Sequence, residues 1–170
     1  MEKSSLLTLI PYLSMTAMTP LVGPVADGLV QRGWEITNVR KLCQGISFAG
    51  PALMMIGCGL LTPEKAAVAG PALIPVLVGM LSVSFALGAW ARGGLYCNHQ
   101  DLSPKYASAL LGLSNTAGAL PGVLGVTLAG HLLDQTGSWA QALFFPTAVC
   151  QVFGLIVYSL FASSKRQNWA

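Results

Sequence analysis

The sequence predicts an all-α integral membrane protein, and two features of its composition support this prediction. Of its 170 residues, 54% are hydrophobic and only 9% are charged, whereas soluble domains carry roughly a quarter charged residues. The apolar residues also gather in long runs, and about 20 consecutive apolar residues are enough for a helix to cross a bilayer. The net charge of +3 is modest, and the basic residues form no cluster dense enough to indicate nucleic-acid binding.

Five apolar runs predict about five transmembrane helices in a single transmembrane domain that covers residues 1–170. The runs lie at about residues 6–30, 42–61, 67–91, 107–133 and 140–162. The first run is too long for the core of a signal peptide, which has roughly 7–15 residues. Prolines occur inside several runs, and in a helix bundle the neighbouring helices can satisfy the backbone groups that they free.

The four cysteines predict neither a disulfide framework nor a metal site. Cys43, Cys58, Cys97 and Cys150 are scattered, whereas zinc sites and disulfide frameworks need closely spaced or convergent thiols. We therefore expect reduced cysteines buried in helices, no bound metal and no cofactor.

The basic residues predict the orientation of the chain in the membrane. They gather after the first, third and fifth apolar runs, at Arg32, Arg40, Lys41, Arg92, Lys105, Lys165 and Arg166. The opposite side has only Lys3 and Lys65. Because cytoplasmic loops are enriched in Lys and Arg, we expect a non-cytoplasmic N-terminus and a cytoplasmic C-terminus. An odd number of spans with the N-terminus outside and no polar leader is unusual for a complete carrier, which suggests a fragment.

A dense polar cluster separates the third and fourth runs, at residues 96–106. Polar side chains at membrane depth usually face a protein interior or a water-filled cavity, so they indicate a functional site. His99 can exchange a proton near neutral pH, and Tyr96, Asn98 and Asn115 can hydrogen-bond the oxygens of an anion. These four residues are candidates for substrate binding or coupling. The alternative is a helix–loop–helix junction whose polar groups satisfy one another.

Other charged residues are candidates for gating or structural roles. In the first connection, Gly23 would permit close approach of a helix, and Asp27 would pair with Arg32 or Arg40. The alternative is that the basic residues only fix the topology of this loop. We expect Asp101 to pair with Lys105 or Arg92, or to cap the start of the fourth span.

Two segments resemble transporter signatures. Gly-Pro-Val-Ala-Asp-Gly-Leu-Val-Gln-Arg-Gly at residues 23–33 resembles the loop signature of the major facilitator superfamily. Asn-His-Gln-Asp-Leu-Ser-Pro-Lys-Tyr-Ala-Ser at residues 98–108, followed by Leu-Gly-Leu-Ser-Asn-Thr-Ala-Gly at residues 111–118, resembles the anion:cation symporter family. That family includes the vesicular glutamate and nucleotide transporters and the plant and algal anion or phosphate transporters.

The resemblance implies a place in a known fold. The chain would correspond to helices 8–12 of the twelve-helix major facilitator fold, with the N-terminal half absent. It would then be part of a secondary active transporter for inorganic phosphate or an organic anion, coupled to H+ or Na+. Its partners would be the lipid bilayer, the anion and the N-terminal half. The membrane itself, whether plastid, vesicle or plasma membrane, is not specified.

A small-residue face is predicted along the fourth span. Gly118, Gly122, Gly125 and Ala129 recur at helical spacing, and small residues allow close packing of helices in lipid. Two alternatives to transport remain: a truncated membrane protein that associates with partner helices, and an intramembrane enzyme that uses His99 and Asp101. An enzyme usually needs further convergent acids, histidines or a nucleophile, so we expect no catalysis.

Overall fold

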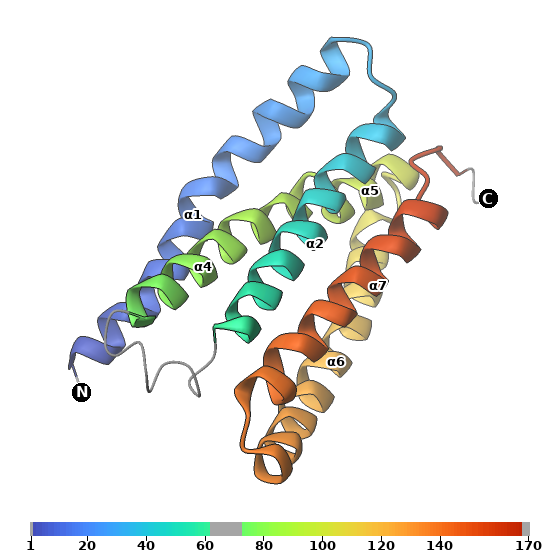
Figure 1. Ribbon diagram of the computed structural model, residues 1–170. Helices are drawn as coiled ribbons and strands as arrows, with labels where there is room; N and C mark the ends of the chain where they lie inside the picture. The colour runs from blue at the N-terminus through green and yellow to red at the C-terminus, as the bar shows by residue number, and fades with distance from the viewer. Residues whose placement is uncertain (1, 62–72, 168–170) are drawn as a thin grey trace.

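The computed structural model describes residues 2–61 and 73–167, with side chains from residue 7 onward. The described chain is helical (Figure 1). Its α-helices are α1 (Glu2–Gln31), α2 (Ile36–Leu60), α4 (Leu73–Gly88), α5 (Leu95–Leu102), α6 (Ala107–Thr136) and α7 (Phe145–Phe161). A 3₁₀ turn, η2 (Ala89–Arg92), joins α4 to α5, and a π-helical turn, η3 (Ala140–Phe144), precedes α7.

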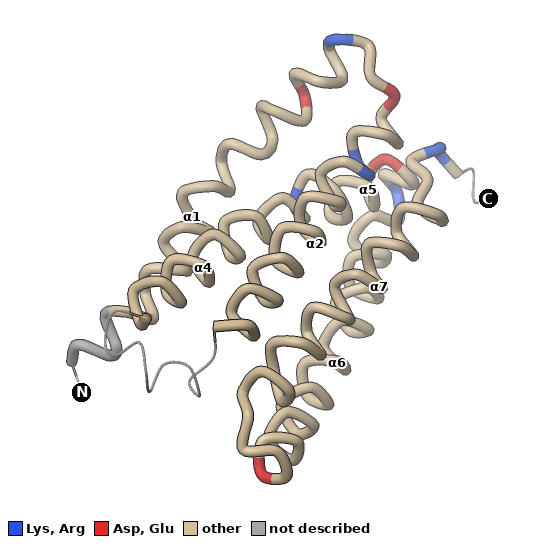
Figure 2. Tube along the Cα trace, viewed as in Figure 1, with Lys and Arg blue, Asp and Glu red and all other residues tan. Residues whose placement is uncertain are grey.

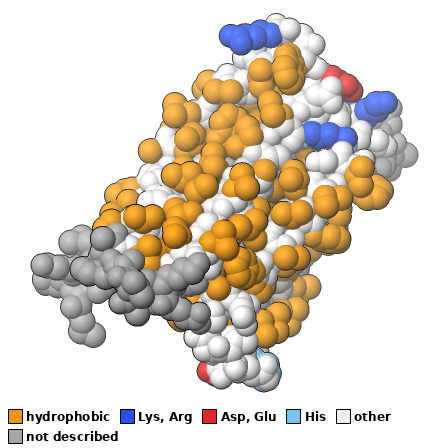
Figure 3. All heavy atoms as spheres, viewed as in Figure 1, with side chains coloured by type: hydrophobic (Ala, Val, Ile, Leu, Met, Phe, Trp, Pro, Cys, Tyr) orange, Lys and Arg blue, Asp and Glu red, His pale blue; other side chains and the backbone are white. Residues whose placement is uncertain are grey.

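Five segments are long and apolar enough to cross a membrane, which confirms the predicted fold class. They are Leu7–Gln31, Ile36–Leu60, Leu73–Leu102, Ala107–Thr136 and Ala140–Phe161. The start of the third predicted span, residues 67–72, lies outside the described residues, as do Lys65 and the side chain of Lys3. Hydrophobic side chains cover the face seen in Figure 3, and the coloured charges on that face lie towards its ends. An apolar lateral surface of this kind suits contact with lipid.

The third span does not end where the sequence predicts. We predicted that the third span ends at about residue 91, but residues 95–102 form α5, which continues the span after a break at Gly93 and Gly94. The break follows from close packing, because a Cβ on Gly94 would lie 2.8 Å from the backbone nitrogen of Gln44. The polar residues of α5 remain helical because they find partners on α2 and on the chain after α7.

Helix α2 lies at the centre of the bundle. It packs against α4 on one side and α7 on the other, while α1 packs against α4 (Figure 1). Val39, Cys43 and Cys58 on α2 are completely buried. Helix α6 differs sharply, because none of its 30 residues is buried. The described chain is therefore a compact group of helices with α6 at its edge.

Most of the described charged residues gather at one end of the helices. Figure 2 shows them at the end where α1 meets α2 and where α5 and the chain after α7 lie, with an acidic residue at the opposite end, where α6 is connected to α7. The basic residues after the first, third and fifth spans thus share one end. The candidate site lies at this end.

Candidate functional site

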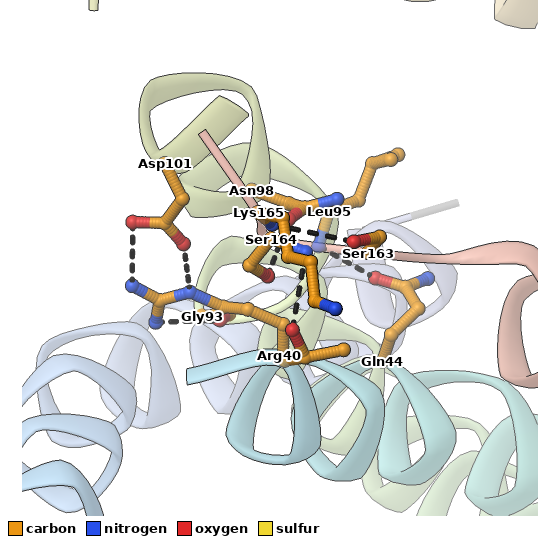
Figure 4. A network of polar contacts seen from close by, with 10 residues as sticks. Arg40, Gln44, Gly93, Leu95, Asn98, Asp101, Ser163, Ser164 and Lys165 are labelled. Atoms are coloured by element: carbon orange, nitrogen blue, oxygen red, sulfur yellow. Dashed lines mark hydrogen bonds and ion pairs between the residues drawn. The ribbon is translucent and has the colours of Figure 1, made fainter. Parts of the chain in front are cut away.

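An ion pair between Arg40 and Asp101 is the centre of a polar network at the charged end (Figure 4). The Arg40 Nε donates to Asp101 Oδ2 at 2.6 Å, and Nη2 lies 3.4 Å from Oδ1. Nη1 donates to the carbonyl of Gly93 at 3.1 Å. The side chains are 12% and 20% exposed. Arg40 therefore uses three nitrogen donors of its forked guanidinium group. Two of them contact Asp101 on α5, and the third contacts the Gly93 carbonyl at the break before α5.

This ion pair corrects three predictions. Asp27 was expected to pair with Arg32 or Arg40, and Asp101 was expected to pair with Lys105 or Arg92 or to cap the start of the fourth span. The observed partners are 61 residues apart, so sequence proximity could not indicate them. Asp101 also does not cap α6, which has Tyr106 at its N-cap.

The other charged candidates lie at the surface. Asp27 and Arg32 are exposed near the end of α1, and no ion pair joins them in the described part of the chain. Arg92 donates to Thr19 Oγ1 at 3.0 Å. No atom of a neighbouring described segment lies within 4 Å of a Cβ built on Gly23, so the close helix approach predicted there is not made by the described residues.

The side chain of Lys105 contacts an aromatic ring rather than a carboxylate. Its Nζ lies 5.1 Å from the centroid of the Tyr106 ring, within the range of a cation–π interaction. The described contact of Lys105 is thus with its neighbour in the connection between α5 and α6.

Gln44 is a functional residue of this network that the sequence interpretation missed. Its Oε1 accepts a hydrogen bond from the backbone N–H of Leu95 at 3.0 Å, and its side chain is 3% exposed. The first N–H groups of a helix have no partner within the helix, so Gln44 satisfies one of them for α5. A lone amide inside the apolar run of α2 was the available signal.

The chain after α7 completes the network. Residues 162–167, which we name the C-terminal strap, fold back over the end of α5 (Figures 1 and 4). Ser164 Oγ donates to Asn98 Oδ1 at 2.6 Å, and Ser164 N–H donates to Thr37 Oγ1 on α2 at 3.2 Å. The backbone N–H of Gln167 donates to the carbonyl of Leu102 at 2.9 Å. The strap therefore joins α2 and α5 to the end of α7.

The four candidates for substrate binding occupy different environments. Asn98 and His99 are buried on α5, at 6% and 7% exposure, while Tyr96 on the same helix is 45% exposed. Asn115 is exposed on α6. The structure thus brings Asn98 and His99 together in the interior and leaves Tyr96 and Asn115 at the surface of the described chain.

Some buried polar atoms lack a partner among the described residues. His99 Nδ1 is one of them, and the hydroxyl of Tyr158 on α7 is another. A buried polar atom without a hydrogen bond is costly and usually has a functional or structural explanation. The unpaired His99 Nδ1 is therefore a feature of this end of the bundle that needs an explanation.

The predicted small-residue face on α6 is open. No atom of another described segment lies within 4 Å of a Cβ built on Gly118, Gly122 or Gly125. Gly122, Gly125 and Ala129 line a cavity of about 640 Å³ between α6 and the start of α7. The close packing that this face predicts is thus not made within the described chain.

The side chains offer little for metal or thiol chemistry. Among the described residues, no group of three or more His, Cys, Asp or Glu is placed to hold a metal ion. All four cysteines are free, with Cys43 and Cys58 buried, Cys97 partly buried and Cys150 exposed. The predicted burial therefore holds for only two of the four cysteines.

The helices and their apolar surfaces define a multi-pass membrane protein whose polar network lies at one end of the bundle. No protein-family model matches the chain. It is 40% identical over 173 residues to "Probable anion transporter 6, chloroplastic" of Arabidopsis thaliana, covering 99% of this chain and 31% of that protein. It is 37% identical over 164 residues to "Sodium-dependent phosphate transport protein 1, chloroplastic" of the same plant, covering 96% and 30%. It is 33% identical over 173 residues to human sialin, covering 99% and 33%.

Over nearly its whole length the chain is therefore similar to named anion and phosphate transporters, which supports the resemblance to the anion:cation symporter family. It spans about a third of the length of the curated relatives that it matches.

Proposed function

We propose that the chain is a segment of a secondary active transporter for inorganic phosphate or an organic anion, coupled to a cation. The observation that carries the proposal is the identity of 37–40% to named plant anion and phosphate transporters over nearly the whole chain. The name of one relative describes its phosphate transport as sodium-dependent, and coupling to a proton would instead need a group such as the His99 imidazole. The same identity argues against the alternative of a non-transporting truncated protein.

The buried face of α5 supports roles for Asn98 and His99 in substrate binding or coupling. The Ser164 hydroxyl donates a hydrogen bond to the carbonyl oxygen of the Asn98 amide. The NH₂ group of that amide would then donate to an anion. The neighbouring His99 has a free Nδ1 in a buried position, and a histidine there can take up and release a proton. Tyr96 and Asn115 would join them only if another part of the transporter brought a cavity to their exposed faces.

The Arg40–Asp101 pair supports a gating or structural role at the end of the bundle. It fixes α5 to α2 through two charge-assisted hydrogen bonds, and such bonds are roughly twice as strong as neutral ones. Asp27 and Arg32 are exposed at the connection between α1 and α2. Their free charges fit contacts to helices outside this chain.

The open face of α6 supports the N-terminal half of a transporter as partner. A 30-residue helix with no buried residue and a row of glycines suits close packing against other transmembrane helices. Alternating access also needs two repeats that move around a central site. The chain would then supply helices 8–12 of the fold, with its charged end in the cytoplasm.

A split transporter tests this proposal. The part of the phosphate transport protein that this chain does not match would be produced alone and together with this chain, and phosphate uptake into liposomes would be measured. We expect saturable uptake only when both polypeptides are present. Saturable uptake by this chain alone would refute the requirement for a second half. Two correctly inserted polypeptides without uptake would count against the transport function.

A further inference from the structure

The C-terminal strap is held to the bundle by three hydrogen bonds. Its sequence, Ala-Ser-Ser-Lys-Arg-Gln at residues 162–167, suggests only a basic membrane-edge anchor. In the structure α7 ends at Phe161, Ala162 takes an extended conformation, and the strap turns towards α5 (Figure 4). A segment that served only as an anchor would not need to bond two other helices, α2 and α5.

Ser164 makes the most specific contact of the strap. Its hydroxyl is 2.6 Å from Asn98 Oδ1, and its backbone N–H is bonded to Thr37 on α2. Asn98 is 94% buried, since its exposure is 6%. Because the carbonyl side of the amide faces Ser164, the orientation of the Asn98 NH₂ group is determined by the strap.

The strap and the ion pair hold the same end of α5 at different points. Asn98 lies three residues before Asp101, so the two side chains leave neighbouring positions on the helix surface. Gln167 adds a bond to the carbonyl of Leu102, the last residue of α5, where helical carbonyls lack an internal partner. Arg40 thus binds α5 from α2, while the strap binds it from the end of α7.

Of the segments in this network, the strap should need the least free energy to detach from the bundle. Lys165, Arg166 and Gln167 are exposed, and few apolar contacts hold a segment of this kind. Local opening of such segments needs far less free energy than global unfolding. The ion pair, at 12% and 20% exposure, is shielded and less easily exchanged.

We propose that the C-terminal strap is a latch on α5 and that Ser164 is a positioning residue for Asn98. When the strap is bound, the Asn98 amide is held with its NH₂ group in one direction and the end of α5 is fixed. When the strap is released, Asn98 Oδ1 loses its donor, the Ser164 hydroxyl, and the side-chain bonds from Arg40 and Gln44 still hold α5 to α2. The latch itself does not depend on transport, whereas the consequence for an anion rests on the proposed function of Asn98.

Limited proteolysis of the detergent-solubilised chain tests the latch. Trypsin cuts after Lys165 and Arg166, and it needs an extended, unbound backbone on both sides of the cut. Ser164→Ala, Asn98→Ala and Thr37→Val each remove one strap contact. Because one hydrogen bond contributes about 0.5–1.5 kcal/mol, we expect each to raise the initial rate of cleavage roughly three- to tenfold. Ser164→Thr keeps the hydroxyl and should cleave at the wild-type rate.

The controls separate a latch from general destabilisation. Ser159→Ala changes an exposed serine on α7 and should leave cleavage unchanged. The double variant Ser164→Ala with Asn98→Ala should cleave no faster than the faster single variant, because both remove the same bond. Thermal unfolding should stay within a few degrees of wild type for Ser164→Ala. Equal cleavage rates in wild type and Ser164→Ala, or a faster rate matched by an equivalent loss of global stability, would overturn the latch.

Discussion

The Arg40 guanidinium and the Asp101 carboxylate lie 2.6 Å apart and join α2 to α5. The pair connects two helices that are separated in sequence by the whole of α4. Arg40 also donates a hydrogen bond to the carbonyl of Gly93, at the break in the third span. The pair is therefore the main electrostatic contact that fixes α5.

Breaking this pair from one side should destabilise the chain strongly. Arg40→Met or Asp101→Leu leaves a shielded charge without its partner, and we expect a loss of about 2–4 kcal/mol. The double variant should lose less than either single variant, because no unpaired charge remains. Thermal unfolding in detergent would measure all three. Arg32→Met, at an exposed position, is the control, and a double variant less stable than both single variants would contradict this explanation.

Adding a methyl group at Gly94 should disturb the break before α5. A Cβ there would lie 2.8 Å from the Gln44 backbone nitrogen and 2.8 Å from its side-chain oxygen. Because a backbone atom cannot move aside easily, Gly94→Ala should cost about 1–3 kcal/mol. Gly88→Ala, where nothing lies within 4 Å, should be neutral or slightly stabilising. Equal unfolding temperatures for the two variants would show that α2 and α5 are not packed this closely.

Gln44 should contribute more to the free energy of unfolding than its position in an apolar run indicates. Gln44→Met keeps the size of the side chain but removes the acceptor for the Leu95 N–H. The buried donor then lacks a partner, and we expect a loss of about 1–3 kcal/mol. Gln100→Met changes an exposed glutamine on α5 and serves as control. Hydrogen exchange should show faster exchange at the start of α5 in Gln44→Met only, and unchanged protection there would contradict the assigned bond.

The two histidines provide a matched pair for testing the coupling site. His99 is buried with a free Nδ1, whereas His131 is exposed and contacts Gln135 at 3.0 Å. In a transporter that contains this chain, His99→Ala should lower anion uptake tenfold or more, and His131→Ala should leave it near wild type. Asn115→Ala should raise KM if Asn115 contacts the anion. Uptake that is equally insensitive to both histidine variants would exclude His99 from coupling.

The sequence was sufficient for the fold class but not for the partners of its polar residues. Five apolar runs indicated five spans because length and hydropathy are local properties. Arg40, Asp101, Gln44 and Ser164 find partners 51–66 residues away, and such distances depend on how the helices pack. The same packing explains α5: residues 95–102 lie beyond the third apolar run and have polar side chains, but their partners on other elements allow them to continue the helix.

The most direct test of the account is sodium-dependent phosphate uptake by a chimaera. The segment of the chloroplast phosphate transport protein that matches this chain would be replaced with residues 1–170, and initial uptake rates in liposomes would be compared with those of the parent. The account predicts saturable uptake that depends on the inserted segment and is reduced by Arg40→Ala. A chimaera that inserts and folds like the parent but takes up no phosphate or other anion would contradict it.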